Sequence, residues 1–261
     1  MERERGLRLA SYKQPCLKRR LAVRMRARGV HGYGDYAALL DRAPEEYDLL
    51  LDALTINVTK FFRNPEAWAA LRERVVAPLV AGAGPIAVWS AGCASGEEPY
   101  SLALEFLERP WGGGAGGGKR GATPAARLRL EATDLDPGAV AAARAARYAA
   151  PAVAEVPAAW LRRWFSPGPP FLLDPAVARL VRFAVHDLTR EAAPAPPYHL
   201  IACRNVVIYF DRPAQERLFE RFADALLPGG WLWLGKVETL FGRARERFVL
   251  EEPRERLFRR L

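Results

Sequence analysis

Histidine and cysteine are scarce in this sequence, and their scarcity argues against several kinds of site. The 261 residues include three of each. Cys16, Cys93 and Cys203 lie far apart and form no CxxC or mixed Cys/His cluster, so neither a disulfide framework nor a zinc site is expected. The histidines share no metal-ligand spacing, so no metal and no histidine-centred triad is predicted. Isolated cysteines favour a reducing, cytoplasmic location.

Long hydrophobic segments are missing as well. No apolar run reaches about 18 residues, so we expect no insertion into a membrane. The first residues, MERERGLRLASYK, contain no apolar stretch of the kind that a secretory signal needs. The chain is rich instead in positive charge, with 39 Lys and Arg against 30 Asp and Glu and a formal net charge of +9. That charge favours an acidic partner without choosing between nucleic acid, membrane and protein.

Residues 1–62 have helical patterns and are expected to form a small N-terminal domain. Leu17, Leu21 and Met25 recur every four residues, as on one apolar face of a helix. From Lys13 to Arg28 there are seven basic residues and no acidic one. Such a run is most often a solvated helix face, and a docking surface is the alternative. Two further helices are expected at 35–40 and 44–54.

Strands and helices alternate from residue 84 onward, which predicts an α/β fold for residues 63–261. Expected strands are 86–90, 128–133, 180–185, 199–203 and 231–235, followed by a terminal hairpin of 247–251 and 256–260. Expected helices are 99–108, 136–148 and 213–227. This order implies a mostly parallel sheet with helices on both faces. A glycine-rich stretch, 111–126, is expected to be a flexible linker.

The turn after the first predicted strand holds the first candidate binding residues. Ligands of open α/β sheets bind at the carboxyl ends of the strands, and Gly92 lies there. The turn matches neither GxxxxGK[ST] nor GxGxxG, and Glu97 and Glu98 follow it. Carboxylates would repel a pyrophosphate, whereas they can bind hydroxyls or an ammonium group. They can equally be favourable first-turn residues of a helix, so two interpretations stand.

Asp134, just beyond the second predicted strand, favours a ligand site. An acid at this place can accept hydrogen bonds from both hydroxyls of a ribose. Asp136 is available to cap the next helix, so Asp134 is not needed for that purpose. The indicated ligand has a ribose, a cation and no phosphate. S-adenosylmethionine meets all three conditions.

Seven motifs, in order along the chain, resemble those of the chemotaxis-receptor glutamate O-methyltransferases, the CheR family. They are YKQPCLKRRLAVRM, LTINVTKFFRNP, WSAGCASGEEPYSLA, ATDLDPGAVAAAR, RFAVHDL, ACRNVVIYFD and LLPGGWLWLGKVETL. The resemblance implies a Rossmann-like S-adenosylmethionine-dependent methyltransferase domain behind a small all-α N-terminal domain. It also implies a short β-subdomain, which we place at 157–185, where the chain between two predicted elements is too long for an ordinary loop.

The resemblance also implies the residues of the site. With Gly92, those that would bind the cofactor are Asn57, Thr59, Arg63, Glu97, Glu98, Asp134, Asp187, Leu188, Asn205 and Val206. Arg63 and Tyr209 are the catalytic candidates. The guanidinium of Arg63 can hold a carboxylate by two bonds, either that of the substrate or that of the cofactor, and an interdomain ion pair is the alternative. Tyr209 would shape the transfer channel. The cofactor would be S-adenosylmethionine, its product S-adenosylhomocysteine, with no metal.

The implied reaction transfers a methyl group from S-adenosylmethionine to glutamate carboxylates of chemoreceptors, giving methyl esters in chemotaxis-type adaptation. The partner would be the receptor's helical bundle, met by the basic helix Lys13–Arg28, with the receptor C-terminal peptide on the β-subdomain as a second contact. One alternative is a methyltransferase of nucleic acid or of a small acid, but the basic residues cluster on one helix and no nucleic-acid module is present. The other is a non-catalytic cofactor sensor, against which the intact NVTKFFR and CRNVVIYF motifs argue.

The sequence departs from the family's pattern at one place near the expected site. Members often have Gly-His-Ser-Glu after the fifth strand, where this chain has Gly235-Lys236-Val237-Glu238. Any role that depends on the His-Ser pair is therefore not expected here. The stretch assigned to the β-subdomain is also short, which leaves peptide docking open.

Overall fold

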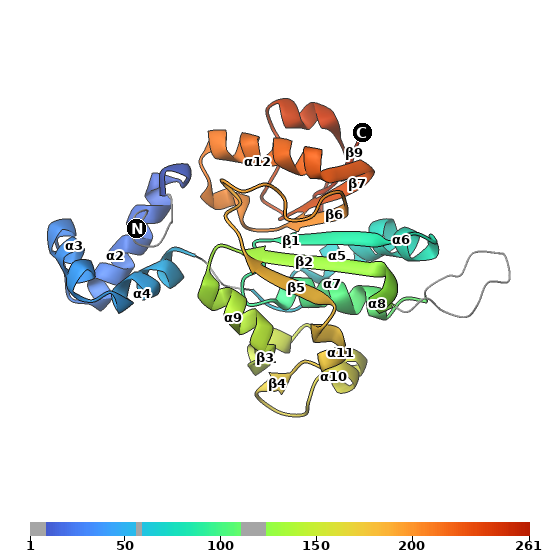
Figure 1. Cartoon of the computed structure of the whole chain (residues 1–261), viewed down its shortest axis with the longest axis horizontal. Coiled ribbons are helices and arrows are strands. Elements are labelled where there is room, and N and C mark those ends of the chain that lie inside the picture. Colours follow the sequence, from blue (N-terminus) through green and yellow to red (C-terminus); the bar gives the residue numbers. More distant parts are fainter. Residues whose placement is uncertain (1–8, 56–58, 111–123) are drawn as a thin grey trace.

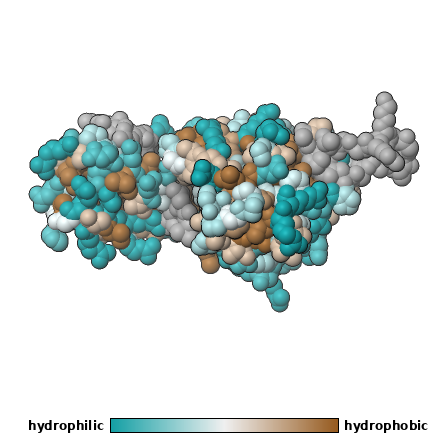
Figure 2. All heavy atoms as spheres, turned by 90° about the horizontal axis from the view of Figure 1, so that it is seen from below, coloured by the Kyte–Doolittle hydropathy of each residue, from teal (hydrophilic) through white to brown (hydrophobic). Residues whose placement is uncertain are grey.

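A computed structural model of the chain describes residues 9–55, 59–110 and 124–261 (Figure 1). The predicted binding residue Asn57 lies outside the described residues, as does most of the glycine-rich stretch expected to be a linker. The described chain divides into a helical N-terminal part and a larger α/β part, as predicted. Figure 2 shows the N-terminal helices as a separate lobe whose surface is mostly hydrophilic on that face.

The N-terminal lobe contains the three predicted helices, α2 (Gln14–Ala27), α3 (Tyr33–Arg42) and α4 (Glu45–Leu54), after a short turn η1 (Leu9–Ser11). Their apolar faces meet in a small core that includes Met25, Tyr36 and Leu50. Glu46 lies in this core and accepts hydrogen bonds from Arg24 at 2.6 and 2.8 Å and from the Tyr36 hydroxyl at 2.8 Å. A polar contact thus adds to the apolar core, because one buried carboxylate joins the three helices.

A seven-stranded sheet forms the centre of the α/β part, in the order β5-β2-β1-β6-β7-β9-β8. Its strands are β1 (Ile86–Ala91), β2 (Leu128–Asp134), β5 (Val181–Val185), β6 (Tyr198–Cys203), β7 (Leu226–Leu234), β8 (Phe248–Glu252) and β9 (Leu257–Arg260). The first five strands of this order run parallel and the last two form the predicted antiparallel hairpin. The predicted α/β fold is confirmed. The strand order reverses between β1 and β6, which is where such sheets bind ligands.

Alternate residues of β1 point to two different cores, as the two-residue period of a strand requires. Ile86 and Val88 join the core under α5 (Pro65–Leu71), η2 (Arg72–Val76), α6 (Ala77–Ala81) and α7 (Glu97–Leu107). Trp89 joins the core under α12 (Arg212–Ala225) on the other face (Figure 1). The helices over 65–81 had not been predicted. They occupy the chain between the N-terminal lobe and β1.

A small antiparallel sheet pairs β3 (Arg147–Tyr148) with β4 (Phe171–Leu172), next to η3 (Ala150–Val153), α10 (Ala158–Trp164) and α11 (Pro175–Ala178). The predicted range 157–185 is wrong at both ends. β3 precedes it, because α9 (Pro137–Ala145) ends at a left-handed Ala146 rather than running through Tyr148. β5 belongs to the large sheet, where it pairs with β2.

Candidate functional site

A cavity lies at the carboxyl ends of β1, β2, β5 and β6, beside the point where the strand order reverses. Ten predicted site residues line it: Thr59, Arg63, Gly92, Glu98, Asp134, Asp187, Leu188, Asn205, Val206 and Tyr209. They come from five segments that are distant in sequence. Four of these segments meet because parallel strands end at one edge of the sheet, and the fifth, with Thr59 and Arg63, precedes α5. Tyr12 and Thr55 also line the cavity, so the N-terminal lobe supplies part of its wall.

The turn after β1 brings main chain to the cavity surface. Gly92 has φ +85°, and a β-carbon there would lie 2.4 Å from a methyl carbon of Val206. The amides of Gly92 and Cys93 both donate to the Thr133 carbonyl, at 2.8 and 2.9 Å, which ties the turn to the end of β2. Only glycine fits this position, so the close approach predicted from sequence has a steric basis.

Asp134, at the end of β2, is hydrogen-bonded to the same turn through its side chain. One carboxylate oxygen accepts the Ala94 amide at 2.8 Å and the other accepts the Asp136 amide at 3.0 Å. Asp136 is the cap of α9, since its side chain accepts the Gly138 amide at 2.8 Å, as predicted. Burial raises the pKa of Asp134, and hydrogen bonds from the amides of Asp136, Ala94 and Leu135 oppose that rise. A carboxylate has about four acceptor sites, so three amides leave capacity for a ligand hydroxyl.

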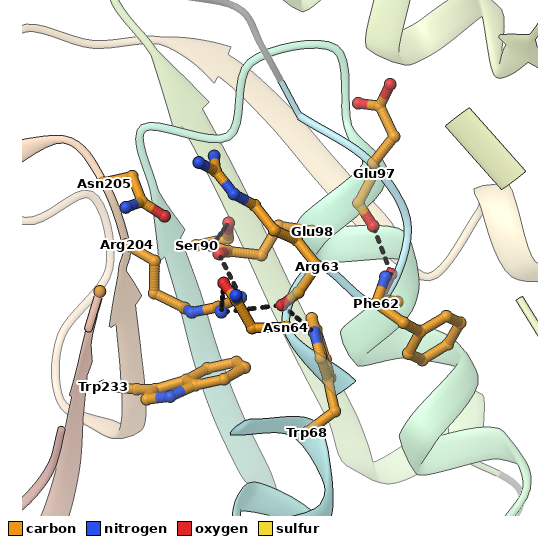
Figure 3. Close-up of polar contacts among 12 residues, drawn as sticks. Phe62, Arg63, Asn64, Trp68, Ser90, Glu97, Glu98, Arg204, Asn205 and Trp233 are labelled. Carbon is orange, nitrogen blue, oxygen red and sulfur yellow. Dashed lines mark hydrogen bonds and ion pairs between the residues drawn. The ribbon is translucent and has the colours of Figure 1, made fainter. Parts of the chain in front are cut away.

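Glu97 and Glu98 diverge, although they are neighbours in sequence. Glu98 lines the cavity and accepts the Ser90 hydroxyl at 2.9 Å, whereas Glu97 is not among the lining residues. The Glu97 carboxylate accepts the Ser95 hydroxyl at 2.8 Å and points away from the cluster around Glu98 (Figure 3). The first turn of a helix separates consecutive side chains by roughly 100°, so one of the two must turn away. Burial raises the pKa of Glu98, and Arg204 opposes that rise most strongly.

Arg63 stands between two residues with left-handed backbone, Phe62 at φ +52° and Asn64 at φ +62°. Such conformations cost about 1 kcal/mol or more each and persist only where the surroundings fix them. The Phe62 amide donates to the Ser101 hydroxyl at 3.0 Å, which attaches this segment to α7. The Arg63 carbonyl accepts the Trp68 indole N–H at 3.0 Å. The side chain of Arg63 extends into the cavity.

Arg204 also lines the cavity, and the sequence analysis missed it. Its side chain is 3% exposed, and the guanidinium carbon lies 4.0 Å from the centre of the Trp233 ring. One terminal nitrogen donates to the Arg63 carbonyl at 2.9 Å, and the other lies 3.6 Å from a Glu98 oxygen. The available signal was a basic residue directly after a buried strand, inside CRNVVIYF.

The loop after β6 is fixed by a buried glutamate from the end of β7. Glu238 accepts the amides of Gly235 at 2.6 Å, Asn205 at 2.9 Å and Ile208 at 3.3 Å. Burial raises the pKa of Glu238, and these amides oppose it. The loop leads to Tyr209, whose carbonyl accepts the Lys13 amide at 2.9 Å. The Glu of the Gly-Lys-Val-Glu stretch is thus an anchor of the cavity wall.

The two residues that depart from the family's pattern lie outside this anchor. Val237 is 75% exposed, and the Lys236 ammonium lies 3.7 Å from Glu66 and 3.5 Å from Glu255. Neither Lys236 nor Val237 lines the cavity. The departure therefore changes the surface beside the cavity and leaves its wall intact.

No helix over 9–55, 59–110 and 124–261 combines the length and apolar character that crossing a bilayer requires. Over the same residues, no three His, Cys, Asp or Glu side chains are grouped so that they could hold a metal ion.

Comparison with known proteins matches both parts of the chain. The CheR methyltransferase, SAM binding domain matches residues 57–255, and the CheR methyltransferase, all-alpha domain matches residues 1–55. A chemotaxis protein methyltransferase of Listeria innocua is 32% identical, over 94% of this chain and 88% of that protein. One of Klebsiella aerogenes is 33% identical, over 94% of this chain and 82% of that protein.

A 104.1 kDa uncharacterized protein of Rhodobacter capsulatus is 35% identical over 96% of this chain, which spans only 26% of that longer protein. The resemblance drawn from seven motifs is confirmed, and both domain matches agree with the helical lobe and parallel sheet described above. The chain belongs to the CheR methyltransferase family and carries both its all-alpha domain and its S-adenosylmethionine-binding domain.

Proposed function

We propose that this chain methylates glutamate side chains of chemoreceptors, using S-adenosylmethionine. One observation carries the proposal: a single cavity holds two carboxylates suited to the cofactor, Glu98 and Asp134, together with the guanidinium of Arg63. The names of the relatives, chemotaxis protein methyltransferases, support the pathway. When bound, S-adenosylmethionine supplies a methyl group made electrophilic by the sulfonium.

The cavity residues fit this cofactor. Asp134 would accept the ribose hydroxyls, and Glu98 would accept the ammonium of the methionyl part. Gly92 lines the cavity without a side chain, and it allows Val206 to pack against the turn. Asp187 and Leu188 would flank the adenine, and Thr59, Asn205 and Val206 would complete the wall. Glu97 has no direct part in this arrangement, because its carboxylate faces Ser95.

Arg63 would orient the substrate carboxylate. A free glutamate has a pKa near 4.3 and is ionised at neutral pH, so no residue of the chain needs to act as a general base. The remaining task is alignment at roughly 3 Å, which a planar guanidinium can provide by holding one carboxylate oxygen while the other reacts. Tyr209 lines the same cavity and would limit the directions from which the glutamate enters.

The basic helix α2 would dock on the receptor's methylation helices, but only part of its charge is available for that. Arg20 donates to the Ala53 carbonyl at 2.8 Å, and Arg24 is paired with Glu46. The exposed basic residues of this segment are Lys13, Lys18, Arg19, Arg26 and Arg28, of which Arg28 also lies 3.4 Å from Glu46. We propose these as the docking surface, and the sheet β3–β4 as the place for a receptor C-terminal peptide. Three unpaired cysteines support a cytoplasmic location.

The test is incubation with methyl-labelled S-adenosylmethionine and, separately, a chemoreceptor cytoplasmic fragment, RNA and free dicarboxylic acids. We expect label on the receptor that base releases, because methyl esters hydrolyse in base. Label on RNA or on the small acid would replace the proposed substrate. Cofactor binding without transfer to any of them would favour a sensor.

A further inference from the structure

We infer that Arg204 is a positioning residue, which fixes the place of the Arg63 main chain relative to the Glu98 carboxylate. One buried guanidinium would then align the group proposed to orient the substrate with the group proposed to bind the cofactor. The inference rests on the proposed function of Arg63 and Glu98. It assigns a role to a cavity-lining residue that the proposed function leaves without one.

The surroundings of Arg204 are unusual for a buried cation. Removing an arginine from water costs several kcal/mol, which good pairing must offset. Two indoles offset part of it, with ring centres 4.0 Å (Trp233) and 5.7 Å (Trp68) from the guanidinium carbon (Figure 3). The Nε is buried and has no hydrogen-bond partner among the residues that the structure describes. The arginine is therefore held in place by its ring contacts and its terminal nitrogens.

The contact with Arg63 controls a strained segment. The Arg63 carbonyl has two donors from different parts of the fold, Trp68 at 3.0 Å and Arg204 at 2.9 Å, and Asn64 Oδ1 lies 3.4 Å from the same nitrogen of Arg204. Left-handed residues flank Arg63 on both sides, so the peptide plane that these donors hold sets the direction of its side chain. Without Arg204, this carbonyl loses one of these two donors and keeps the one from the nearby helix α5. We expect the Arg63 guanidinium to shift.

The contact with Glu98 has a different character. At 3.6 Å, the Arg204 nitrogen lies beyond the range of a good hydrogen bond, so it contributes positive charge without occupying the carboxylate. The direct partner of Glu98 is the Ser90 hydroxyl at 2.9 Å. The nearby charge opposes the rise that burial causes in the pKa of Glu98, and the carboxylate keeps lone pairs for a ligand ammonium. A bidentate pair would have used those lone pairs.

Two variants separate the two contacts. Arg204→Lys keeps the charge near Glu98 and loses the planar fork, so we expect the dissociation constant for S-adenosylhomocysteine to stay within about threefold while kcat falls about tenfold or more. Arg204→Met loses both, so kcat falls at least as far and the dissociation constant also rises about tenfold. Calorimetry measures binding, and saturating cofactor with a receptor fragment measures kcat.

Arg72 is the matched control, because it pairs with Glu105 on the same helix as Glu98 but outside the cavity. Arg72→Lys should leave both the dissociation constant and kcat unchanged. Arg204→Lys keeps the positive charge. It therefore still tests the inference if Arg204→Met does not fold. The inference would be overturned if both Arg204 variants had equally lowered melting temperatures but kept the wild-type dissociation constant for S-adenosylhomocysteine and the wild-type kcat.

A crystal structure of Arg204→Lys with S-adenosylhomocysteine gives a readout independent of the receptor. The expected result is a displaced Arg63 side chain with Glu98 in place, and an undisplaced Arg63 would overturn the positioning role. Wild-type protein that binds S-adenosylhomocysteine but methylates no receptor would refute the proposed substrate instead. The binding and crystallographic comparisons would still decide the role of Arg204 in that case.

Discussion

Two glutamates of helix α7, the half-buried Glu98 and the buried Glu105, both face an arginine, yet they are paired in opposite ways. Glu105 accepts two hydrogen bonds from Arg72, at 2.9 and 2.5 Å, and lies 3.8 Å from Arg109. Glu98 accepts one hydroxyl and has its arginine at 3.6 Å. The carboxylate in the core is saturated by the protein, and the one in the cavity is not.

This difference indicates which charges are available for chemistry. Seven residues make about two turns, so the two glutamates project from similar sides of α7 into different surroundings. A saturated pair stabilises the contact between η2 and α7 and has no capacity left for a ligand. An under-coordinated carboxylate at a cavity can bind a cation, and the fold supports it from a distance through Arg204.

The largest contrast is expected between the two arginines Arg63 and Arg72. Arg63→Ala should lower kcat by about a hundredfold, because misaligning reacting groups by 1 Å has effects of that size. Its melting temperature should change little. Arg72→Ala should leave kcat unchanged and lower the free energy of unfolding by about 2 kcal/mol, less than a fully buried pair because Arg72 is 33% exposed. Methylation assays and thermal melts of both variants measure this. An unaltered methylation rate in Arg63→Ala would refute its catalytic assignment.

Removing the carboxylate charges should give the next largest effect. Glu98→Gln should weaken binding of S-adenosylhomocysteine by about tenfold to a hundredfold, the range of a charge-assisted hydrogen bond. Glu105→Gln should leave that affinity unchanged and lower the melting temperature, because it leaves the Arg72 guanidinium partly buried without its counter-ion. Calorimetry with S-adenosylhomocysteine separates the two variants. If both variants lost the same affinity for S-adenosylhomocysteine, the number of hydrogen bonds that each glutamate accepts from the protein would not explain which one binds the cofactor.

The sequence predicted the sheet well and the site only in part, for physical reasons. Strands such as β1 and β6 are short apolar runs bounded by small or polar residues, and their length favours a buried strand over a helix. Glu97 and Glu98 could not be separated, since both suit a helix start. Their roles depend on which one faces the cavity.

Arg204 escaped detection because its partners Trp68 and Trp233 are distant in sequence, and a single sequence does not show which residues meet. The boundaries of the small sheet failed for a local reason. A strand of two residues, such as Arg147–Tyr148, has no period to recognise.

The pH dependence of cofactor binding would sharpen the same comparison. Burial raises the pKa of Glu98 above its usual 4.5, although Arg204 and Arg63 oppose the rise. The ionised form is the one proposed to bind the ammonium, so affinity should be full above the raised pKa and fall as the pH drops through it. That fall should begin at a higher pH than for an ordinary glutamate. Calorimetry across this range should show a shallower fall in Glu98→Gln, with the remainder due to Asp134, whose pKa burial also raises.

The smallest expected effect extends the contrast to helix α2, where Arg19 is exposed and Arg24 is paired with the buried Glu46. Arg19→Ser should raise the Michaelis constant for a receptor fragment by about twofold to threefold at low salt, and the increase should shrink as salt screens the exposed charge. Arg24→Ser should instead lower the melting temperature and leave the salt dependence of that constant unchanged. Michaelis constants measured at two ionic strengths decide it. An Arg19→Ser effect that persists at high salt would mean that this residue makes a short-range contact with the receptor rather than a screened one.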